Sequence, residues 1–127
     1  MRIENQMDAQ PTKLRIEPLL WLLFSAGGVV AAFLIPIHLF ILGIAAPLGW
    51  TKATDYTSAT AFLAFPIVRL YLFVLCSLPL FHAAHRIRYT LYDGLQIKHL
   101  NEVIAVCCYG GAVVGTVIAG YLLWNFV

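Results

Sequence analysis

Three long stretches with almost no charged residues constrain this sequence more than any other feature. They cover about residues 19–48, 59–84 and 103–127. Each is longer than the roughly 20 apolar residues that a helix needs to cross a hydrocarbon core of about 30 Å. Because backbone groups cannot hydrogen-bond to lipid, each stretch is predicted to be a helix. The sequence therefore predicts an all-α membrane protein with three transmembrane helices.

The composition excludes several other classes of protein. Of the 127 residues, 61% are hydrophobic and only 11% are charged, so a water-soluble domain of this size could not cover its surface with polar groups. The same composition excludes a disordered chain, and three cysteines are too few for a disulfide scaffold. The net charge of +2 does not favour nucleic acid as a partner.

The chain is predicted to have two parts. Residues 1–18 form an N-terminal segment, and residues 19–127 form the three-helix anchor domain. The first apolar run is too long for a cleavable signal, so we expect the mature protein to keep it. Pro36 removes a backbone donor inside this run, which predicts a tilted and kinked first helix. Asp55 is expected to help cap the second helix.

The lysine and arginine residues that flank the helices predict the orientation of the chain. Three precede the first helix, one lies in the first loop and three lie in the second loop: Arg2, Lys13 and Arg15, then Lys52, then Arg86, Arg88 and Lys98. The positive-inside rule then places the N-terminus and the second loop in the cytoplasm. The first loop and the C-terminus are expected outside.

Small residues at helical spacing predict close helix packing. Gly111, Gly115 and Ala119 recur every four residues in the third apolar stretch, and Gly27 and Ala31 do so in the first. Such stripes let another backbone approach closely. Spacing alone leaves open whether that backbone belongs to this chain or to another subunit.

A few polar residues lie deep in the apolar stretches and have both structural and functional interpretations. Arg69 is either an anchor in the outer leaflet or a contact for a lipid, a quinone or another subunit. His38 is either hydrogen-bonded to a neighbouring helix or an axial haem ligand. The three cysteines have no metal-binding spacing and are interpreted as packing residues: Cys76, Cys107 and Cys108.

The predicted topology brings one polar and aromatic cluster together. The first helix begins at the cytoplasmic face and the second ends there, so residues near these two ends lie at one depth. Helical spacing puts the members from each helix on a common face. The cluster comprises Trp21, Phe24 and Ser25 from the first helix and His82, His85 and Arg86 from the second.

This cluster has the chemistry of a quinone site. Indole, hydroxyl, imidazole and guanidinium groups can donate to the carbonyl oxygens of a lipid-soluble ring, and aromatic side chains can hold that ring. A quinone also exchanges protons, and His85 is the candidate for this role, since the imidazole group changes charge near neutral pH. The alternative interpretation is that Trp21 and Arg86 are interface anchors without a ligand.

Two segments of the sequence resemble the family of fumarate reductase D subunits. Residues 17–28, EPLLWLLFSAGG, are similar to the start of that family's first helix. Residues 78–80, LPL, followed by His85-Arg86 and Asp93, resemble the end of its second helix and the next loop. Arg69 also has a counterpart in the family, and the resemblance extends along nearly the whole chain from Glu17.

The resemblance implies a hydrophobic anchor in the bacterial cytoplasmic membrane. With a second membrane-anchor protein, the C subunit, it would hold an iron–sulfur subunit and a flavoprotein subunit, which carry the clusters and the flavin. Menaquinol would bind at the cytoplasmic end and supply electrons that reduce fumarate to succinate, while this chain would not bind the dicarboxylate. Trp21, Phe24, His85 and Arg86 match positions that line or border that site, and Ser25 replaces an expected glycine.

The sequence also departs from the family in ways that keep alternatives open. Arg88, Tyr89 and Tyr92 replace a histidine-rich run, and His38 replaces an apolar residue. The family's anchor lacks haem, so none is expected, but related succinate dehydrogenase anchors bind haem b, for which His38 and His82 would be the ligands. A small membrane transporter is less favoured, because the spans contain no carboxylate away from their ends.

Overall fold

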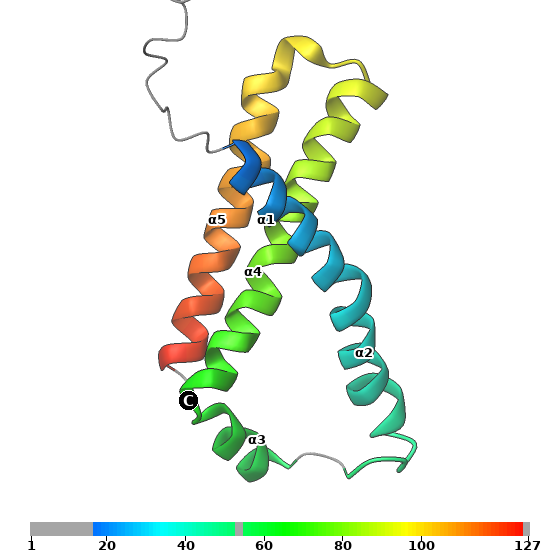
Figure 1. Cartoon of the computed structure of the whole chain (residues 1–127), viewed down its shortest axis with the longest axis vertical. Helices are drawn as coiled ribbons and strands as arrows, with labels where there is room; N and C mark the ends of the chain where they lie inside the picture. Colours follow the sequence, from blue (N-terminus) through cyan, green and yellow to red (C-terminus); the bar gives the residue numbers. More distant parts are fainter. Residues whose placement is uncertain (1–16, 53–54, 126–127) are drawn as a thin grey trace, which may run out of the picture.

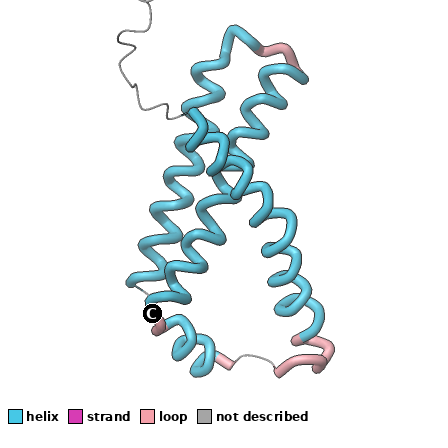
Figure 2. Tube along the Cα trace, viewed as in Figure 1, coloured by secondary structure: helices cyan, strands magenta, loops and turns pink. Residues whose placement is uncertain are grey.

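The computed structural model describes residues 17–52 and 55–125, and these residues form helices and loops without a strand (Figure 2). Within these ranges, three helical runs are long and apolar enough to cross a membrane: Pro18–Ala45, Pro66–Gly94 and Lys98–Asn125. The prediction of an all-α membrane protein with three spans is therefore confirmed. Nearly all of the predicted segment 1–18 lies outside the described residues, and the orientation of the termini stays a prediction.

The first span is a helix interrupted by two wider π-helical segments. It consists of α1 (Glu17–Val29), the π-helical Val30–Leu34, α2 (Ile35–Phe40) and the π-helical Ile41–Ala45. Pro36 lies in the first turn of α2, directly after the first π-helical segment. Prolines and π-bulges are recognised causes of helix bends. In Figure 1, α1 crosses α4 and the chain then turns away, so that α2 diverges from it.

The second span begins later and ends later than the sequence predicted. A short separate helix, α3 (Tyr56–Leu63), precedes α4 (Pro66–Tyr89), so the predicted continuous helix from residue 59 is wrong at its start. Phe65 is extended (φ −72°, ψ 124°), as expected for the residue before a proline. Beyond α4, helical structure continues in the π-helical Thr90–Gly94, past the predicted end at residue 84.

The third span forms an antiparallel hairpin with the second. A single 3-10 turn, Lys98–Leu100, leads into α5 (Asn101–Asn125), which returns along the side of α4 (Figure 1). The turn that joins them places Arg86, Arg88 and Lys98 at one end of the molecule, which we call the basic end. The start of α1 packs against α4 near this end, so the two helix ends that the topology predicted to meet lie together.

The helices approach closely where glycines leave room for them. A Cβ atom on Gly27 would lie 2.5 Å from the carbonyl oxygen of Leu78 and 2.9 Å from the Cβ of His82, so α1 rests directly on α4. A Cβ on Gly115 would lie 2.9 Å from a methyl group of Leu80. For Gly27 and Gly115, the small-residue stripes therefore pack within this chain. Gly111 has open space around it in the same structure.

Arg69 contacts the backbone at the junction of α3 and α4. Its Nε donates a hydrogen bond of 2.7 Å to the carbonyl oxygen of Leu63, the last residue of α3. Carbonyls at the end of a helix lack intrahelical partners, and a cation suits that end of the helix dipole. The guanidinium thus stabilises the break that Pro66 creates. The roles of Arg69 as an outer-leaflet anchor or as a contact for a lipid, a quinone or another subunit stay predictions.

We predict that Gly27→Ala destabilises the chain, because the added methyl group meets backbone of α4 that cannot move aside on its own. Overpacking of this kind costs about 1–3 kcal/mol, which exceeds the gain in helix propensity of up to ~1 kcal/mol. Gly110→Ala is the matched control, since nothing lies within 4 Å of its added Cβ. Unfolding of the purified chain in mixed detergent micelles measures both. Equal stability of the two variants would contradict the close α1–α4 contact.

A second prediction concerns the pH dependence of α3. The Asp55 carboxylate accepts a 2.7 Å hydrogen bond from the Ser58 amide, and this bond to Ser58 lowers the pKa of Asp55 below its ordinary value. Because the pKa is lower in the folded state, the stabilisation is complete above the ordinary pKa and disappears as the pH falls through the lowered one.

The test is amide hydrogen exchange across α3 as a function of pH, corrected for intrinsic rates. Protection should decline in the acidic range for the natural sequence. Asp55→Asn keeps a capping oxygen and should remove the pH dependence, whereas Asp55→Ala should reduce protection at every pH. A decline of the same size in Asp55→Asn would show that Asp55 is not the titrating group.

Candidate functional site

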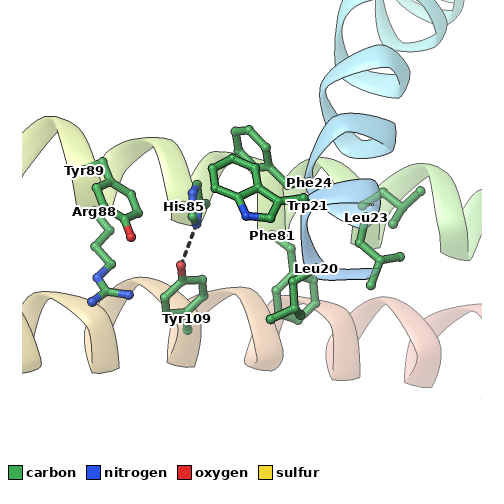
Figure 3. Close-up of a pocket in the computed structure, with 10 residues that line it drawn as sticks. Leu20, Trp21, Leu23, Phe24, Phe81, His85, Arg88, Tyr89 and Tyr109 are labelled. Atoms are coloured by element: carbon green, nitrogen blue, oxygen red, sulfur yellow. Dashed lines mark hydrogen bonds between the residues drawn. The ribbon is translucent and has the colours of Figure 1, made fainter. Parts of the chain in front are cut away.

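A cavity of about 540 Å³ lies between α1, α4 and α5, where α1 crosses α4 (Figure 3). Its volume falls in the range of about 300–1,000 Å³ that is typical of small-molecule sites. The apolar part of its wall consists of Leu20, Leu23, Phe24, Leu78 and Phe81. The polar groups in the lining come from Trp21, His85, Arg88, Tyr89 and Tyr109.

Two aromatic residues of α1 lie side by side at this cavity. Trp21 and Phe24 are three positions apart, so they share a helix face, and their ring centroids lie 6.0 Å apart in an edge-on arrangement. The ring of Phe24 also stacks on His82 of α4 at 4.4 Å. His82 Nδ1 donates a 2.9 Å hydrogen bond to the carbonyl oxygen of Phe24, because a carbonyl can only accept. His82 therefore fixes α1 against α4 and does not line the cavity.

His85 is the imidazole that lines the cavity. Its ring centroid lies 4.5 Å from that of Phe24, 4.6 Å from that of Tyr89 and 6.2 Å from that of Trp21. Its Nδ1 is hydrogen-bonded at 2.8 Å to the hydroxyl of Tyr109, which comes from α5 (Figure 3). Nε2 is the nitrogen left for a bound molecule. Groups from all three spans therefore meet at this one side chain.

Arg88 closes the cavity on the side of the basic end. Its Nε and Nη2 lie 3.4 and 3.2 Å from Oδ1 of Asn101, to which they donate. Its guanidinium carbon also lies 5.4 Å from the ring centre of Tyr89 and 5.7 Å from that of Tyr109, within the range of cation–π attraction. Arg88 is therefore held in place by one amide and two rings.

The structure brings together three of the predicted quinone-site residues and separates the others. Trp21, Phe24 and His85 line the cavity, with His82 packed behind Phe24. Ser25 and Arg86 are exposed and are not part of the lining. Their role as contacts of a bound molecule stays a prediction.

Two other candidate residues lie away from this cavity. Arg69 is at the opposite end of α4, beside α3. His38 of α2 donates from Nδ1 to the carbonyl oxygen of Leu34, and its Nε2 accepts a 3.3 Å hydrogen bond from the hydroxyl of Tyr71 on α4. This arrangement matches the interpretation of His38 as a histidine bonded to a neighbouring helix. Both of its ring nitrogens already have partners.

Sequence reasoning did not include Arg88, Tyr89 and Tyr109 among the site residues. Arg88 and Tyr89 lie two and three residues after Arg86, the last predicted member of the cluster, so a longer stretch of the helix would have included them. Tyr109 stands in an apolar stretch, and the residues next to it in the sequence have no hydroxyl group. The number of residues between the second loop and Tyr109 is about the same as the number between His85 and that loop. Pairing positions across the loop of a helical hairpin is the signal that would have found it.

Comparison with known proteins identifies the family. A model of the family described as the D subunit of fumarate reductase matches residues 11–124. The chain belongs to the fumarate reductase D-subunit family. It is 48% identical to the fumarate reductase D subunit of Mycobacterium tuberculosis (strain H37Rv) over 116 residues, which are 91% of this chain and 93% of the relative. It is 40% identical to that of Shewanella sp. (strain W3-18-1) over 105 residues, 81% of this chain and 85% of the relative.

Membership in the D-subunit family confirms the resemblance that the sequence motifs indicated. The chain is a membrane anchor subunit of a fumarate reductase and acts in a complex with other subunits of that enzyme. Its three spans make it a multi-pass membrane protein. The cavity described above therefore belongs to the membrane part of a redox complex.

The cavity of this anchor offers hydrogen-bonding groups beside an apolar wall. The indole of Trp21 and the guanidinium of Arg88 can only donate, whereas imidazole and phenol groups can both donate and accept. Among residues 17–52 and 55–125, no group of three or more metal-ligating side chains comes together. The arrangement suits an aromatic lipid-soluble molecule with oxygen atoms on its ring.

Proposed function

We propose that this anchor subunit supplies part of a menaquinol-binding site in a quinol:fumarate reductase of the bacterial cytoplasmic membrane. The observation that carries the proposal is the cavity in which Trp21, Phe24 and His85 meet. These residues were selected from the sequence for quinone chemistry, and they match positions bordering the quinol site that the family resemblance implies. Aromatic and apolar side chains beside hydrogen-bonding groups are what a quinol requires.

In this proposal the chain is a non-catalytic anchor within a four-subunit complex. With the second membrane-anchor protein, it attaches the iron–sulfur and flavoprotein subunits to the membrane. The basic end, which the distribution of lysine and arginine places in the cytoplasm, faces those subunits. The dicarboxylate binds to the flavoprotein subunit, and this chain contributes no residue to that site.

The redox reaction balances between two sites. Menaquinol loses two electrons and two protons and becomes menaquinone, which serves anaerobic respiration. The electrons pass through the iron–sulfur subunit to the flavin, where fumarate takes up two electrons and two protons to become succinate. Around the quinol, Phe24 packs against the ring, Trp21 donates a hydrogen bond to an oxygen, and His85 exchanges a proton.

The exposed residues Arg86 and Ser25 have a role in the same proposal. Both belong to the helix ends that form the cavity, yet neither lines it in the single chain. We assign Arg86 to the part of the quinol site that the neighbouring subunits complete. A charged side chain exposed at this depth needs a partner, and a quinol oxygen or a residue of the iron–sulfur subunit provides one.

The haem alternative has less support from the geometry of the described histidines. His82 contacts α1 at Phe24 and Gly28, whereas His38 lies ten residues beyond Gly28, about 15 Å further along the helix at 1.5 Å per residue. One haem cannot take both as axial ligands at that separation. The Nε2 of His38 is already occupied by Tyr71.

The transporter alternative has no supporting observation in the described residues. Proton or cation coupling in membrane proteins usually relies on an acidic residue within a span. Here Asp93 and Glu102 lie at the ends of the second and third spans, and the first span contains no acidic residue. We therefore favour the anchor function over the transporter function.

We predict that Trp21→Leu lowers menaquinol-driven fumarate reduction about tenfold, since losing one hydrogen bond and one ring contact costs on the order of 1.4 kcal/mol. Reduction driven by a soluble dye, which delivers electrons to the soluble subunits, should stay at the natural rate. Arg86→Leu should behave in the same way. The assay uses purified complexes with equal flavin content.

Trp50→Leu is the matched control for Trp21→Leu. The two indoles are similarly exposed, 67% for Trp50 and 63% for Trp21, but Trp50 lies at the opposite end of the molecule beside Phe40. Its loss should leave both activities unchanged. Natural quinol activity in the Trp21→Leu complex would overturn the proposed site, and an equal loss in both variants would indicate a general effect on the membrane anchor.

The same purified complex tests the haem alternative. We expect a reduced-minus-oxidised spectrum without a b-type haem band, together with co-purification of the flavin and iron–sulfur subunits. A b-type band that disappears in His82→Leu or His38→Leu would replace the present proposal with a haem-binding anchor. Recovery of the chain without redox subunits would remove the basis for a quinol site.

A further inference from the structure

The hydrogen-bond partner of His85 differs in kind from those of two other histidines. His38 and His82 each direct Nδ1 to a backbone carbonyl, of Leu34 at 2.6 Å and of Phe24 at 2.9 Å. Nδ1 of His85 instead meets the hydroxyl of Tyr109 at 2.8 Å. The three imidazoles therefore have different freedom to rearrange their protons.

A carbonyl oxygen can only accept a hydrogen bond, so Nδ1 of His38 and of His82 keeps its hydrogen in every protonation state. A hydroxyl can donate or accept by rotating about its C–O bond. His85 can therefore exist in both neutral tautomers without losing its bond to Tyr109. Its remaining nitrogen, Nε2, can present a lone pair in one tautomer and an N–H group in the other.

Tyr109 is itself held in position at the cavity. Its side chain is half-buried, and its ring lies 5.7 Å from the guanidinium carbon of Arg88. Arg88 in turn donates to Asn101, two turns before Tyr109 on α5. Rotation of the hydroxyl is therefore possible while the ring stays in place. The arrangement is visible in Figure 3, where the Tyr109 hydroxyl points to His85.

We propose that Tyr109 is a positioning residue that lets His85 bind both redox forms of the quinone at one nitrogen. The proposal rests on the quinol site proposed above. A quinol presents hydroxyl groups and needs an acceptor, whereas a quinone presents carbonyl oxygens and needs a donor. When Nδ1–H donates to the Tyr109 hydroxyl, Nε2 of His85 has a lone pair and accepts a hydrogen bond from the quinol. When the Tyr109 hydroxyl donates to Nδ1, Nε2–H donates a hydrogen bond to the quinone oxygen.

The proton balance of this step is complete. A quinol O–H bond breaks and its proton binds Nε2 of His85, while the two electrons of the oxidation leave for the iron–sulfur subunit. The imidazolium that forms then loses its Nδ1 proton to water at the basic end through the hydroxyl of Tyr109. This transfer leaves the Tyr109 O–H directed at Nδ1 and Nε2–H bonded to the quinone oxygen. After the quinone leaves, Nε2–H gives its proton to water, and Nδ1 regains a proton from water through the Tyr109 hydroxyl, which turns and restores the starting tautomer. The second quinol proton reaches water from the other oxygen.

Other titratable and charged groups also surround His85, and they bear on any measured pH dependence. On its own helix they are His82, Arg86, Arg88 and Tyr89, and on α5 the group is Tyr109. The residues of α1 that face it, Trp21 and Phe24, do not titrate. A change confined to the Tyr109 hydroxyl therefore leaves every charged neighbour of His85 in place.

The test is Tyr109→Phe in the assembled complex, which removes the hydroxyl and keeps the ring beside Arg88. Menaquinol-driven fumarate reduction should fall about tenfold, and the midpoint of its pH–rate profile should move. Dye-driven reduction should be unchanged, and a menaquinone analogue should bind more weakly, because no hydroxyl then holds His85 in the tautomer whose Nε2–H donates to the quinone oxygen. In a His85→Gln background, Tyr109→Phe should cause no further loss, because its effect runs through His85.

Tyr71→Phe is the matched control, because it also removes a tyrosine hydroxyl bonded to a histidine, at 3.3 Å, but far from the cavity. It should leave the rate and the pH profile unchanged. The inference would be overturned if Tyr109→Phe reduced fumarate with menaquinol at the natural rate and with an unchanged pH–rate profile. It would also be overturned if Tyr109→Phe lowered the quinol-driven rate by a further tenfold in the His85→Gln background. When Tyr109→Phe has no effect, the Trp21→Leu complex distinguishes two explanations. Full quinol activity of Trp21→Leu would show that the proposed quinol site is wrong, whereas impaired activity would show that only the role assigned to Tyr109 is wrong.

Discussion

The contact of α1 with α4 at Gly27 and Gly28 determines how the rest of the molecule is arranged. A Cβ atom at Gly27 would meet the Leu78 carbonyl oxygen at 2.5 Å, and one at Gly28 would meet Cε1 of His82 at 2.8 Å. Because neither glycine carries one, the backbones approach closely enough for His82 to bond the carbonyl oxygen of Phe24. Phe24 and its neighbour Trp21 are thereby placed over His85. The position of the cavity therefore depends on the glycine contact with α4, which lies one to two turns further along α1.

The bend in the first span limits this packing to one half of the molecule. Hydrocarbon chains are as apolar as leucine, so a membrane gives two apolar helices little reason to stay together along their whole length. Past the π-helical Val30–Leu34, α2 diverges from α4 (Figure 1). The hydrogen bond between His38 and Tyr71 then links the two helices by side chains alone. Close backbone contact is concentrated where the candidate site lies.

Much of the fold could be predicted from the sequence, because few structures satisfy a backbone in lipid. The three spans and the meeting of Trp21, Phe24 and His85 followed from helix length and from the charge distribution between loops. The start of the second span could not be placed correctly, since the uniform apolarity of residues 59–65 conceals the break at Pro66. Tyr109 was missed because the partner of a residue across a helical hairpin depends on the length of its turn.

The division of roles between His82 and His85 could not be predicted from spacing either. Both are histidines near the end of one helix, three residues apart, and both were assigned to one cluster. Their difference lies in what the neighbouring helices present to them: α1 offers a carbonyl oxygen to His82, and α5 offers a hydroxyl to His85. The first partner fixes a proton and the second allows it to move. Within a single turn, one helix therefore carries an imidazole whose Nδ1 proton is fixed by a carbonyl oxygen and an imidazole whose partner can donate or accept, and the groups packed around them distinguish the two.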